Sequence, residues 1–325
     1  MTNKTASQGK ISEFNFIDKY LRPLASRNSA GLNLADDVAI PTIEGKDSKM
    51  VVSKDIFVQN VHFLATDQPK DIASRLILSN ISDIASSGAL PKYYMLGLPK
   101  RDDLMKGFYD EFCSELAKVQ DLFDISLIGG DTVSAKNDLF FSVTIFGEAP
   151  SGEILRRNAA KIDDDIYVTG LLGDAAAAVP IVTGELQVSS ERFDCFYDRY
   201  WRPQPRLIAG MALKRVVHAM MDISDGLAQD IQHILKASGV GANIDASRVP
   251  ISAELQRWQP ESALILALTG GDDYELCFTA SKEQAAEIAL ITQTLSLPCS
   301  KVGEIVAEGF SIQGYDGELT GWQHF

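Results

Sequence analysis

The chain has 325 residues, a length typical of about two domains. Hydrophobic residues make up 46% of it and charged residues 23%, so it can bury a core and lacks the composition of a disordered chain. Thirty Lys and Arg against 44 Asp and Glu give a formal charge of -14, which argues against nucleic acid and anionic membranes as partners. A phosphate-bearing substrate would therefore need bound cations, or a few placed Arg and Lys side chains.

Cysteine spacing and hydropathy predict a cytoplasmic protein. The four cysteines are irregularly spaced without a C-x-x-C pair, which favours free thiols in a reducing compartment. The first ten residues are polar and lack the apolar core of a signal peptide. No apolar run approaches the roughly 20 residues that span a bilayer.

Helix and strand patterns alternate along the first 150 residues. After Pro69, apolar residues recur at Ile72, Leu76, Ile81 and Ile84, which predicts a helix of about four turns. In chain order the pattern predicts a helix over 14–21 that stops before Pro23, a strand over 50–53, the helix from 69, a strand over 93–98, a helix over 102–122, and strands over 125–128 and 139–146.

The segment GEAPSG, from Gly147 to Gly152, is the best candidate for a domain boundary, because Gly, Pro and Ser cluster there without periodicity. We expect domains at 1–150 and 151–325. The second half predicts strands over 166–169, 274–279 and 301–306, an Ala-rich helix capped at Gly173, and helices over 206–219, 225–237 and 283–292. This alternation predicts an α/β or α+β layer structure.

Aspartates follow apolar runs or stand beside Gly or Ser at several points of the chain, where a rigid scaffold presents functional groups. They are Asp36, Asp37, Asp55, Asp83, Asp131, Asp222, Asp225, Asp272 and Asp273. Carboxylates without nearby His or Cys suit hard cations such as Mg²⁺. Each of these aspartates alone is more typical of an ordinary turn than of a functional site. His62 fits a ligand and a structural histidine equally well, and the pair at Arg156 and Arg157 fits a phosphate grip or a solvated surface.

Missing motifs narrow the chemistry. The sequence has no G-x-x-x-x-G-K-[ST] P-loop and no kinase-type glycine-rich loop with an H-R-D partner. It also lacks a G-x-S-x-G elbow and a Rossmann G-x-G-x-x-G. ATP, if bound, must be held in another way.

A series of motifs runs in order along nearly the whole chain, from about Phe14 to Phe325. These are ADDVAI (35–40), SKDIFVQNVHF (53–63), NISDIASSGA (80–89), LIGGDT (127–132), VTGLLGDAAAA (168–178), MDISDGL (221–227), GGDDYEL (270–276) and GWQHF (321–325). This series resembles the thiamine-monophosphate kinase family, of the aminoimidazole-ribotide-synthetase-like ATP-binding superfamily. The resemblance is specific because no single motif carries it.

The resemblance implies a two-domain fold: an N-terminal mixed sheet that pairs with a second subunit in a homodimer, a C-terminal α/β domain, and an active site in the cleft between them. It also implies transfer of the γ-phosphoryl group of ATP to thiamine monophosphate, giving thiamine diphosphate and ADP, with several Mg²⁺ ions. An acidic protein that needs cations to hold anionic substrates agrees with that activity.

Site residues follow from the resemblance, motif by motif. It places Asp37, Ser53, Lys54, Asp55, Asp83, Asp131, Asp222 and Asp225 around the metals, Gly130, Asp131, Arg157 and Ser224 at ATP, and His62, Asp272 and Trp322 at the thiamine phosphate. Trp322 would offer an aromatic face to the thiazolium cation. We expect direct in-line transfer without a covalent nucleophile or general base, because the second pKa of a phosphate monoester is about 6 and the attacking oxygen is already ionised.

The sequence departs from the family pattern at four places: Ala35 for Gly, Lys54 for a metal-contacting Thr, Ile162 and Asp163 for Pro-Gly, and Asp272 for Glu. We expect the Lys54 side chain to point to solvent, leaving the metal its backbone carbonyl. The alternative is an ammonium that acts on the phosphates from within the cleft.

Other activities of the superfamily fit less well. A selenophosphate synthetase would need a reactive Cys or selenocysteine in its N-terminal loop, and residues 1–30 contain no Cys. The hydrogenase-maturation dehydratase would need a C-terminal Cys, which is absent from WQHF at the end of the sequence. An aminoimidazole ribotide synthetase and a catalytically inactive nucleotide-binding regulator stay open as alternatives.

Overall fold

The computed structural model describes residues 35–36, 48–101, 104, 106–317 and 319. The helix predicted over 14–21 lies outside these residues. The strands are β1 (Lys49–Val58), β2 (Leu90–Lys100), β3 (Ser126–Ser134), β4 (Phe140–Ala149), β5 (Asp165–Thr169), β6 (Ala219–Asp222), β7 (Gly241–Asp245), β8 (Leu276–Ala280), β9 (Cys299–Val306) and β10 (Phe310–Gln313). The α-helices are α3 (Pro69–Ser86), α4 (Lys106–Phe123), α5 (Asp174–Val182), α6 (Ser190–Trp201), α7 (Leu207–Leu213), α8 (Leu227–Ser238), α9 (Ala253–Trp258), α10 (Ala263–Thr269) and α11 (Ala285–Thr294).

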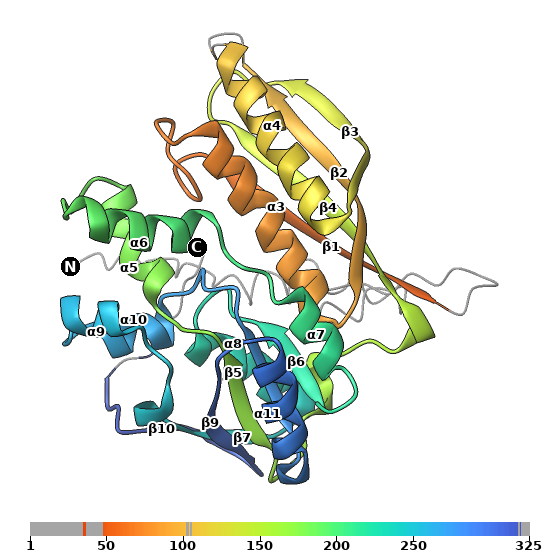
Figure 1. The fold of residues 1–325 in the computed structure, drawn as a ribbon, viewed down its shortest axis with the longest axis vertical. Helices are drawn as coiled ribbons and strands as arrows, with labels where there is room; N and C mark the ends of the chain where they lie inside the picture. The colour runs from red at the N-terminus through yellow and green to blue at the C-terminus, as the bar shows by residue number, and fades with distance from the viewer. Residues whose placement is uncertain (1–34, 37–47, 102–103, 105, 318, 320–325) are drawn as a thin grey trace, which may run out of the picture.

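The first sheet has the strand order β1-β4-β2-β3. Strands β1, β4 and β2 run antiparallel, whereas β3 joins β2 in parallel. Helices α3 and α4 lie on one face of this sheet (Figure 1). Alternate residues of β4, among them Phe141, Val143 and Ile145, are buried on that face, as the two-residue period of a strand dictates. The opposite face carries exposed apolar side chains.

Helix α3 forms the centre of the molecule. Pro69 occupies its first turn, where the missing N–H costs no hydrogen bond. Its residues are buried nearly all round, because it packs against the first sheet on one side and against α7 and β6 on the other. Burying a Leu or Ile side chain contributes about 1.5–3 kcal/mol, so this helix joins the two halves of the chain firmly. Its polar residues are therefore held at fixed positions.

The second sheet has the strand order β10-β7-β9-β5-β8-β6. It is antiparallel except that β10 runs parallel to β7. The central strand β5 is buried along its whole length, with Ile166 and Val168 in one cluster and Tyr167 in another. Buried residues on both sides explain its continuous apolar sequence. The mixed α/β fold with two sheets confirms the predicted fold class.

Several segments differ from the prediction. The strand expected over 50–53 extends to Val58. The strand expected over 125–128 extends to Ser134, so Gly130 and Asp131 lie within β3 and not in a loop after it. The helix expected over 206–219 ends at Leu213, because Ala219–Asp222 pairs with β8 as strand β6. The helices α6, α9 and α10 and the strands β7 and β10 were not predicted.

The division into domains at 1–150 and 151–325 stays a prediction. The strands of the first sheet all lie between Lys49 and Ala149, and those of the second between Asp165 and Gln313. None of the helices in the described part of the chain combines the length and apolarity needed to cross a bilayer.

Candidate active site

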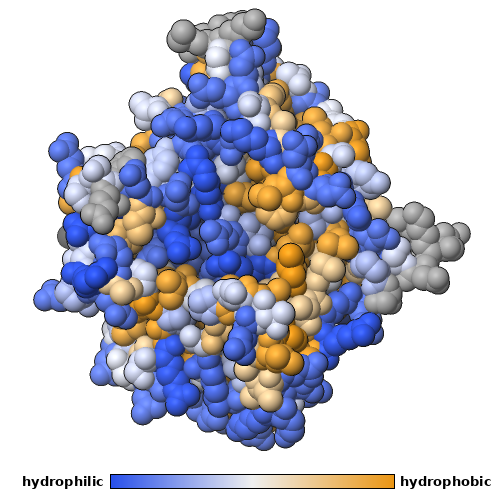
Figure 2. Space-filling view, in the orientation of Figure 1, coloured by the Kyte–Doolittle hydropathy of each residue, from blue (hydrophilic) through white to orange (hydrophobic). Residues whose placement is uncertain are grey.

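A cavity of about 540 Å³ lies between the edge strand β1 and the loops of the second sheet. Figure 2 shows a hollow between the upper and lower halves of the molecule, with hydrophilic residues at its bottom. Its lining residues come from both halves: Ser53, Lys54, Asp55, Ile56, Phe57, Val61, His62, Arg75, Asp83, Val179, Tyr200, Ser224, Asp225, Gly270, Asp272 and Tyr274.

Asp55 and Asp83 line one end of this cavity, and the charge of a third, buried carboxylate, Asp222, acts on Asp83. Each of the three accepts a hydrogen bond from a hydroxyl. Ser53 Oγ on β1 donates to Asp83 Oδ2 on α3 at 2.5 Å. Ser82 Oγ donates to Asp222 Oδ2 at the end of β6, also at 2.5 Å. Ser79 Oγ lies 3.4 Å from Asp55 Oδ2. These hydroxyls orient the acids and leave their remaining lone pairs to accept from a ligand or a cation.

The electrostatics of this end favour a bound cation. Burial raises the pKa of Asp83 well above its ordinary value, and the charges of Asp55 and Asp222 raise it further, whereas the Ser53 hydroxyl lowers it. Burial also raises the pKa of Asp222, against the lowering effects of Ser82 and Arg157. Negative charge confined in this way would be stabilised by a cation.

The donor atoms fit magnesium. Within the described ranges, no three His, Cys, Asp or Glu side chains are arranged to hold a metal ion by themselves. Mg²⁺ does not require such a cage, since it commonly binds through one or two carboxylates together with substrate phosphates and waters. The oxygen-only donors Asp55, Asp83 and Asp222 suit that mode.

The turn after β6 is fixed by an acid that the sequence interpretation missed. The Asp230 carboxylate, in the first turn of α8, accepts the backbone N–H groups of Ser224 at 2.9 Å and Asp225 at 3.0 Å. Burial raises the pKa of Asp230 well above its ordinary value, with Asp225 as the next contributor. The predicted helix over 225–237 contained Asp230 beyond its first turn, and only the observed start of α8 at Leu227 places this acid in the first turn. The Asp225 carboxylate lines the cavity and accepts a bond from Gln229 Nε2 at 3.3 Å.

The loop before β8 brings Asp272 to the same cavity. The Asp272 N–H donates to the Ser224 carbonyl at 2.8 Å, so this loop lies directly on the turn after β6. Gly271 has φ +72°, and a Cβ there would lie 2.4 Å from the same carbonyl oxygen. Only glycine permits this close approach. The backbone of Asp272 itself is in the left-handed region, with φ 61°.

His62 also lines this cavity. Its Nδ1 accepts the Val58 N–H at 3.1 Å, and its ring stacks on Phe57 with centroids 5.0 Å apart. The hydrogen bond assigns the acceptor role to Nδ1, so in the neutral ring Nε2 carries the proton. His62 and Asp272 thus line one cavity, although 210 residues of sequence separate them.

Neither Gly130 nor Asp131 lines this cavity. Strand register aligns Asp131 with Gly97, Gly97 with Ser142, and Ser142 with Ile56. Residues aligned in this way share a face of the sheet, and Ile56 lies on the face away from α3. Asp131 and Asp55 therefore lie on opposite faces.

Lys54 is among the residues that line the cavity, but its side chain extends over the face of the first sheet that is turned away from α3. Its Nζ donates to Ser142 Oγ, and to Thr144 Oγ1 at 3.2 Å, across to strand β4. The side chain is exposed, as the sequence interpretation expected, but two hydroxyls hold its ammonium. Successive side chains of a strand point to opposite faces, so Lys54 and Asp55 diverge.

Arg157 lies among acids of both halves. Its backbone N–H donates to Asp36 Oδ2 at 3.3 Å, and Asp36 and Asp222 are the largest charges acting on the guanidinium. Burial lowers its pKa despite these acids. Ser224 lines the cavity as expected. The predicted residues Asp37 and Trp322 lie outside the described part of the chain.

The cavity also holds residues that the sequence interpretation missed: Arg75, Tyr200 and Tyr274. The available signal for Arg75 was a polar stripe on the predicted helix, since Arg75, Ser79, Ser82 and Asp83 follow one another at helical spacing. No comparable signal marks Tyr200, because it reaches the cavity from α6, which the sequence interpretation did not predict.

Both halves of the chain match known protein families. Residues 35–149 match the AIR synthase related protein N-terminal domain, and residues 161–314 match its C-terminal domain. The thiamine-monophosphate kinase of Escherichia coli (strain K12) is 37% identical over 325 residues, covering 96% of this chain and 98% of that protein. 

Two solved structures cover nearly the whole chain. The structure described as AaThiL complexed with AMPPCP and TMP has a TM-score of 0.87 at 27% identity, covering 99% of this chain and 100% of that one. The thiamine-monophosphate kinase from Stenotrophomonas maltophilia K279a has a TM-score of 0.78 at 33% identity, covering 94% and 98%. With both domain models matched in order and relatives similar over nearly full length, the chain belongs to the thiamine-monophosphate kinase family of AIR synthase related proteins.

Proposed function

We propose that this chain transfers the γ-phosphoryl group of ATP to thiamine monophosphate, giving thiamine diphosphate and ADP. The observation that carries the proposal is one continuous cavity with a carboxylate end and an end built from Arg75, Tyr200 and Tyr274. A structure with the same fold holds AMPPCP, an ATP analogue, together with TMP. Two ligands that must react end to end need a cavity of this kind.

Magnesium ions would be held by Asp55, Asp83 and Asp222, with Asp225 and Asp37 as further ligands that the resemblance implies. When bound, Mg²⁺ supplies positive charge that neutralises the phosphates and aligns them. The chain's own contribution is orientation: Ser53 and Ser82 fix the carboxylates through short hydrogen bonds. Because the attacking phosphate oxygen is already ionised at neutral pH, the proposed transfer is direct and needs no general base.

We further propose that the protein is a cytoplasmic homodimer. The two subunits would meet through the open face of the first sheet, which is the face turned away from α3 and α4. That face exposes large apolar side chains: Ile56 at 49%, Tyr93 at 47%, Met95 at 40% and Phe140 at 45%. Contiguous apolar patches of this kind are typical of protein interfaces. Asp131 lies on the same face, so in such a dimer it would act at the subunit interface and not beside Asp55 of its own chain.

An assay of ADP release against thiamine, thiamine monophosphate and aminoimidazole precursors tests the activity. Thiamine diphosphate should form only from thiamine monophosphate with both ATP and Mg²⁺ present. Binding of the ligands without ADP release would instead identify an inactive regulator. A stable phosphorylated protein trapped with labelled ATP would contradict direct transfer.

Sedimentation analysis tests the dimer. The wild type should sediment at twice the mass of the chain, and Met95→Asp should shift it towards the monomer, because a charge buried at an interface without a partner is strongly unfavourable. Leu290→Asp is the matched control, since Leu290 is 64% exposed on α11, far from the first sheet. A monomeric wild type would contradict the proposed dimer.

A further inference from the structure

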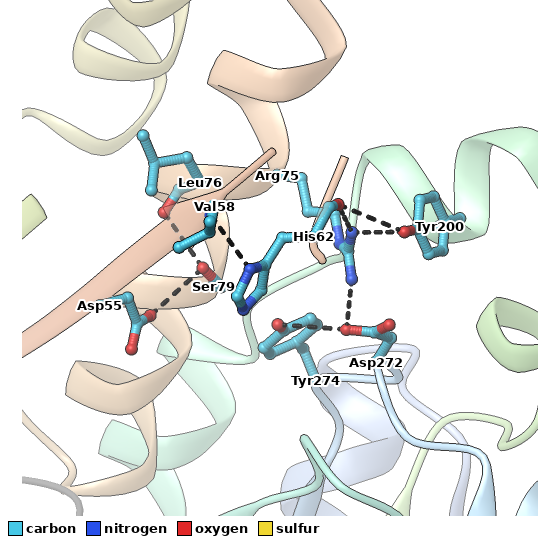
Figure 3. A network of polar contacts seen from close by, with 9 residues as sticks. All are labelled: Asp55, Val58, His62, Arg75, Leu76, Ser79, Tyr200, Asp272 and Tyr274. Atoms are coloured by element: carbon cyan, nitrogen blue, oxygen red, sulfur yellow. Dashed lines mark hydrogen bonds and ion pairs between the residues drawn. The ribbon is translucent and has the colours of Figure 1, made fainter. Parts of the chain in front are cut away.

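We propose that Arg75 is a positioning residue of the substrate end: its guanidinium holds Asp272 and the His62 segment in the places from which they contact the thiamine part of the substrate. Figure 3 shows the side chain between these segments, with its contacts drawn. The inference rests on the proposed function, because the resemblance assigns His62 and Asp272 to thiamine monophosphate.

The guanidinium makes three polar contacts with three different segments. Arg75 Nη2 lies 2.6 Å from Asp272 Oδ1 in the loop before β8. Arg75 Nη1 donates to the Tyr200 hydroxyl on α6 at 2.6 Å and to the His62 carbonyl after β1 at 2.7 Å. With its own place on α3, Arg75 thus connects four segments drawn from both halves of the molecule.

Burial and stacking fix the orientation of this side chain. Only 5% of the Arg75 side chain is exposed. Its Cζ lies 3.9 Å from the centroid of the Tyr200 ring, a cation–π contact that adds to the hydrogen bond that Arg75 donates to the Tyr200 hydroxyl. A planar guanidinium that stacks on an aromatic ring and makes hydrogen bonds along its edge has little freedom to rotate. A lysine ammonium could not make this combination of contacts.

The two carboxylate oxygens of Asp272 differ in their contacts. Arg75 and the Tyr274 hydroxyl, at 3.4 Å, both contact Oδ1. Oδ2 is therefore the oxygen left for a ligand, and the Asp272 side chain keeps 25% exposure on the cavity wall. Arg75 consequently determines where a substrate-facing carboxylate points, without itself having to touch the substrate.

Arg75→Lys tests the orientation and keeps the positive charge. A lysine ammonium cannot reproduce the contacts that the two Nη atoms make with Asp272, Tyr200 and His62. The KM for thiamine monophosphate should therefore rise about 10-fold, which corresponds to the loss of one hydrogen bond to a charged group. The KM for ATP should stay within about 2-fold, because the nucleotide phosphates belong to the acidic end. Arg75→Met should raise the KM for thiamine monophosphate about 100-fold, since the Asp272 carboxylate then lacks its partner.

A double-mutant cycle separates positioning from simple structural support. If Arg75 acts on the substrate mainly through Asp272, Arg75→Met should change the KM much less in an Asp272→Asn background than in the wild type, with the contact to the His62 carbonyl accounting for the remaining effect. A merely structural Arg75 would give multiplicative effects. Asp272→Asn also removes the unpaired charge, so the double variant should fold even where Arg75→Met alone does not.

Arg202→Lys is the matched control. Arg202 Nη2 lies 2.6 Å from Asp71 Oδ1, the same length as the Arg75 pair, and Asp71 is on the same helix. Arg202 does not line the cavity. This variant should lower the melting temperature and leave both KM values unchanged.

Three outcomes decide the inference. A KM for thiamine monophosphate unchanged in Arg75→Lys and Arg75→Met, in an active wild type, would overturn it and leave the proposed function standing. Equal increases in both KM values, or multiplicative effects in the cycle, would assign Arg75 a structural role. A wild type without thiamine-monophosphate kinase activity would overturn the proposed function and this inference with it.

Discussion

Ser82 on α3 and Asp222 at the end of β6 are joined by a 2.5 Å hydrogen bond from the hydroxyl to the carboxylate. The two residues belong to different halves of the chain and are both buried. Asp83 follows Ser82 directly on α3. The bond therefore fixes the position of Asp222 relative to Asp83. Metal binding across the cleft depends on this relative placement.

Ser82→Ala should reduce kcat about 10-fold and raise the Mg²⁺ concentration needed for half-maximal rate. A hydrogen bond to a charged group is worth about 1.5–3 kcal/mol, and its loss leaves the Asp222 carboxylate free to rotate. Steady-state kinetics over a Mg²⁺ titration measure both effects. Ser86→Ala is the control, because Ser86 Oγ donates to the Asp83 carbonyl within the same helix. Equal effects of the two substitutions would contradict a role for Ser82 in placing Asp222.

Asp83→Asn should lower turnover at saturating Mg²⁺ by at least about 100-fold, the scale of losing one electrostatic contact to a transferring group. The metal-free protein should be at least as stable as the wild type, because burial and neighbouring acids disfavour the Asp83 carboxylate. Activity assays and thermal unfolding without metal measure these two quantities. Exposed Asp163, where Asn tolerates the left-handed φ of 72°, provides the control Asp163→Asn. Near-normal turnover in Asp83→Asn would exclude Asp83 as a metal ligand.

The sequence predicted the elements that local patterns determine. The helix after Pro69 follows from the proline in its first turn and from its apolar period, and Asp83 is found on it. Strand β3 was predicted too short because its Gly-Gly-Asp segment is typical of a turn, whereas pairing with β2 keeps it extended.

The composition of the site was only partly predictable, for a related reason. Motifs identified Asp55, Asp83 and Asp222 one by one, but no local signal shows that Ser82 bonds to a strand 140 residues later. The opposite faces of Asp131 and Asp55 also depend on strand order, which a single sequence does not determine. Long-range register and packing therefore limited the prediction.

Lys54→Met should leave the ATP dependence of the rate unchanged. The ammonium bonds to Ser142 and Thr144 on β4, on the face of the sheet away from Asp55. These exposed contacts should contribute no more than about 1 kcal/mol to stability, by analogy with surface polar pairs. Kinetics over an ATP titration check this, with Lys54→Thr as the companion variant. A clear rise in the KM for ATP in both variants would instead identify Lys54 as a phosphate-binding cation.

His233 on α8 should make the protein sensitive to acid. Burial is the largest cause that lowers its pKa, followed by the charges of Arg157 and Lys236, and together they bring it from 6.5 to about 4. A histidine with a lowered pKa is neutral in the folded state, so its stabilising contribution is present above pH 6.5 and is lost as the pH falls through about 4. At about 1.4 kcal/mol per pH unit, the full loss is roughly 3 kcal/mol.

His233→Gln should remove this part of the acid sensitivity, because glutamine is half-buried at the same place without a proton to gain. Urea unfolding at pH 7.5 and pH 4.5 measures the free energy of unfolding of each protein, and the carboxylates titrate alike in both. The wild type should lose about 2 kcal/mol more than the variant between these two pH values, since only part of the titration is complete at pH 4.5. Equal losses would show that His233 keeps an ordinary pKa in the folded protein.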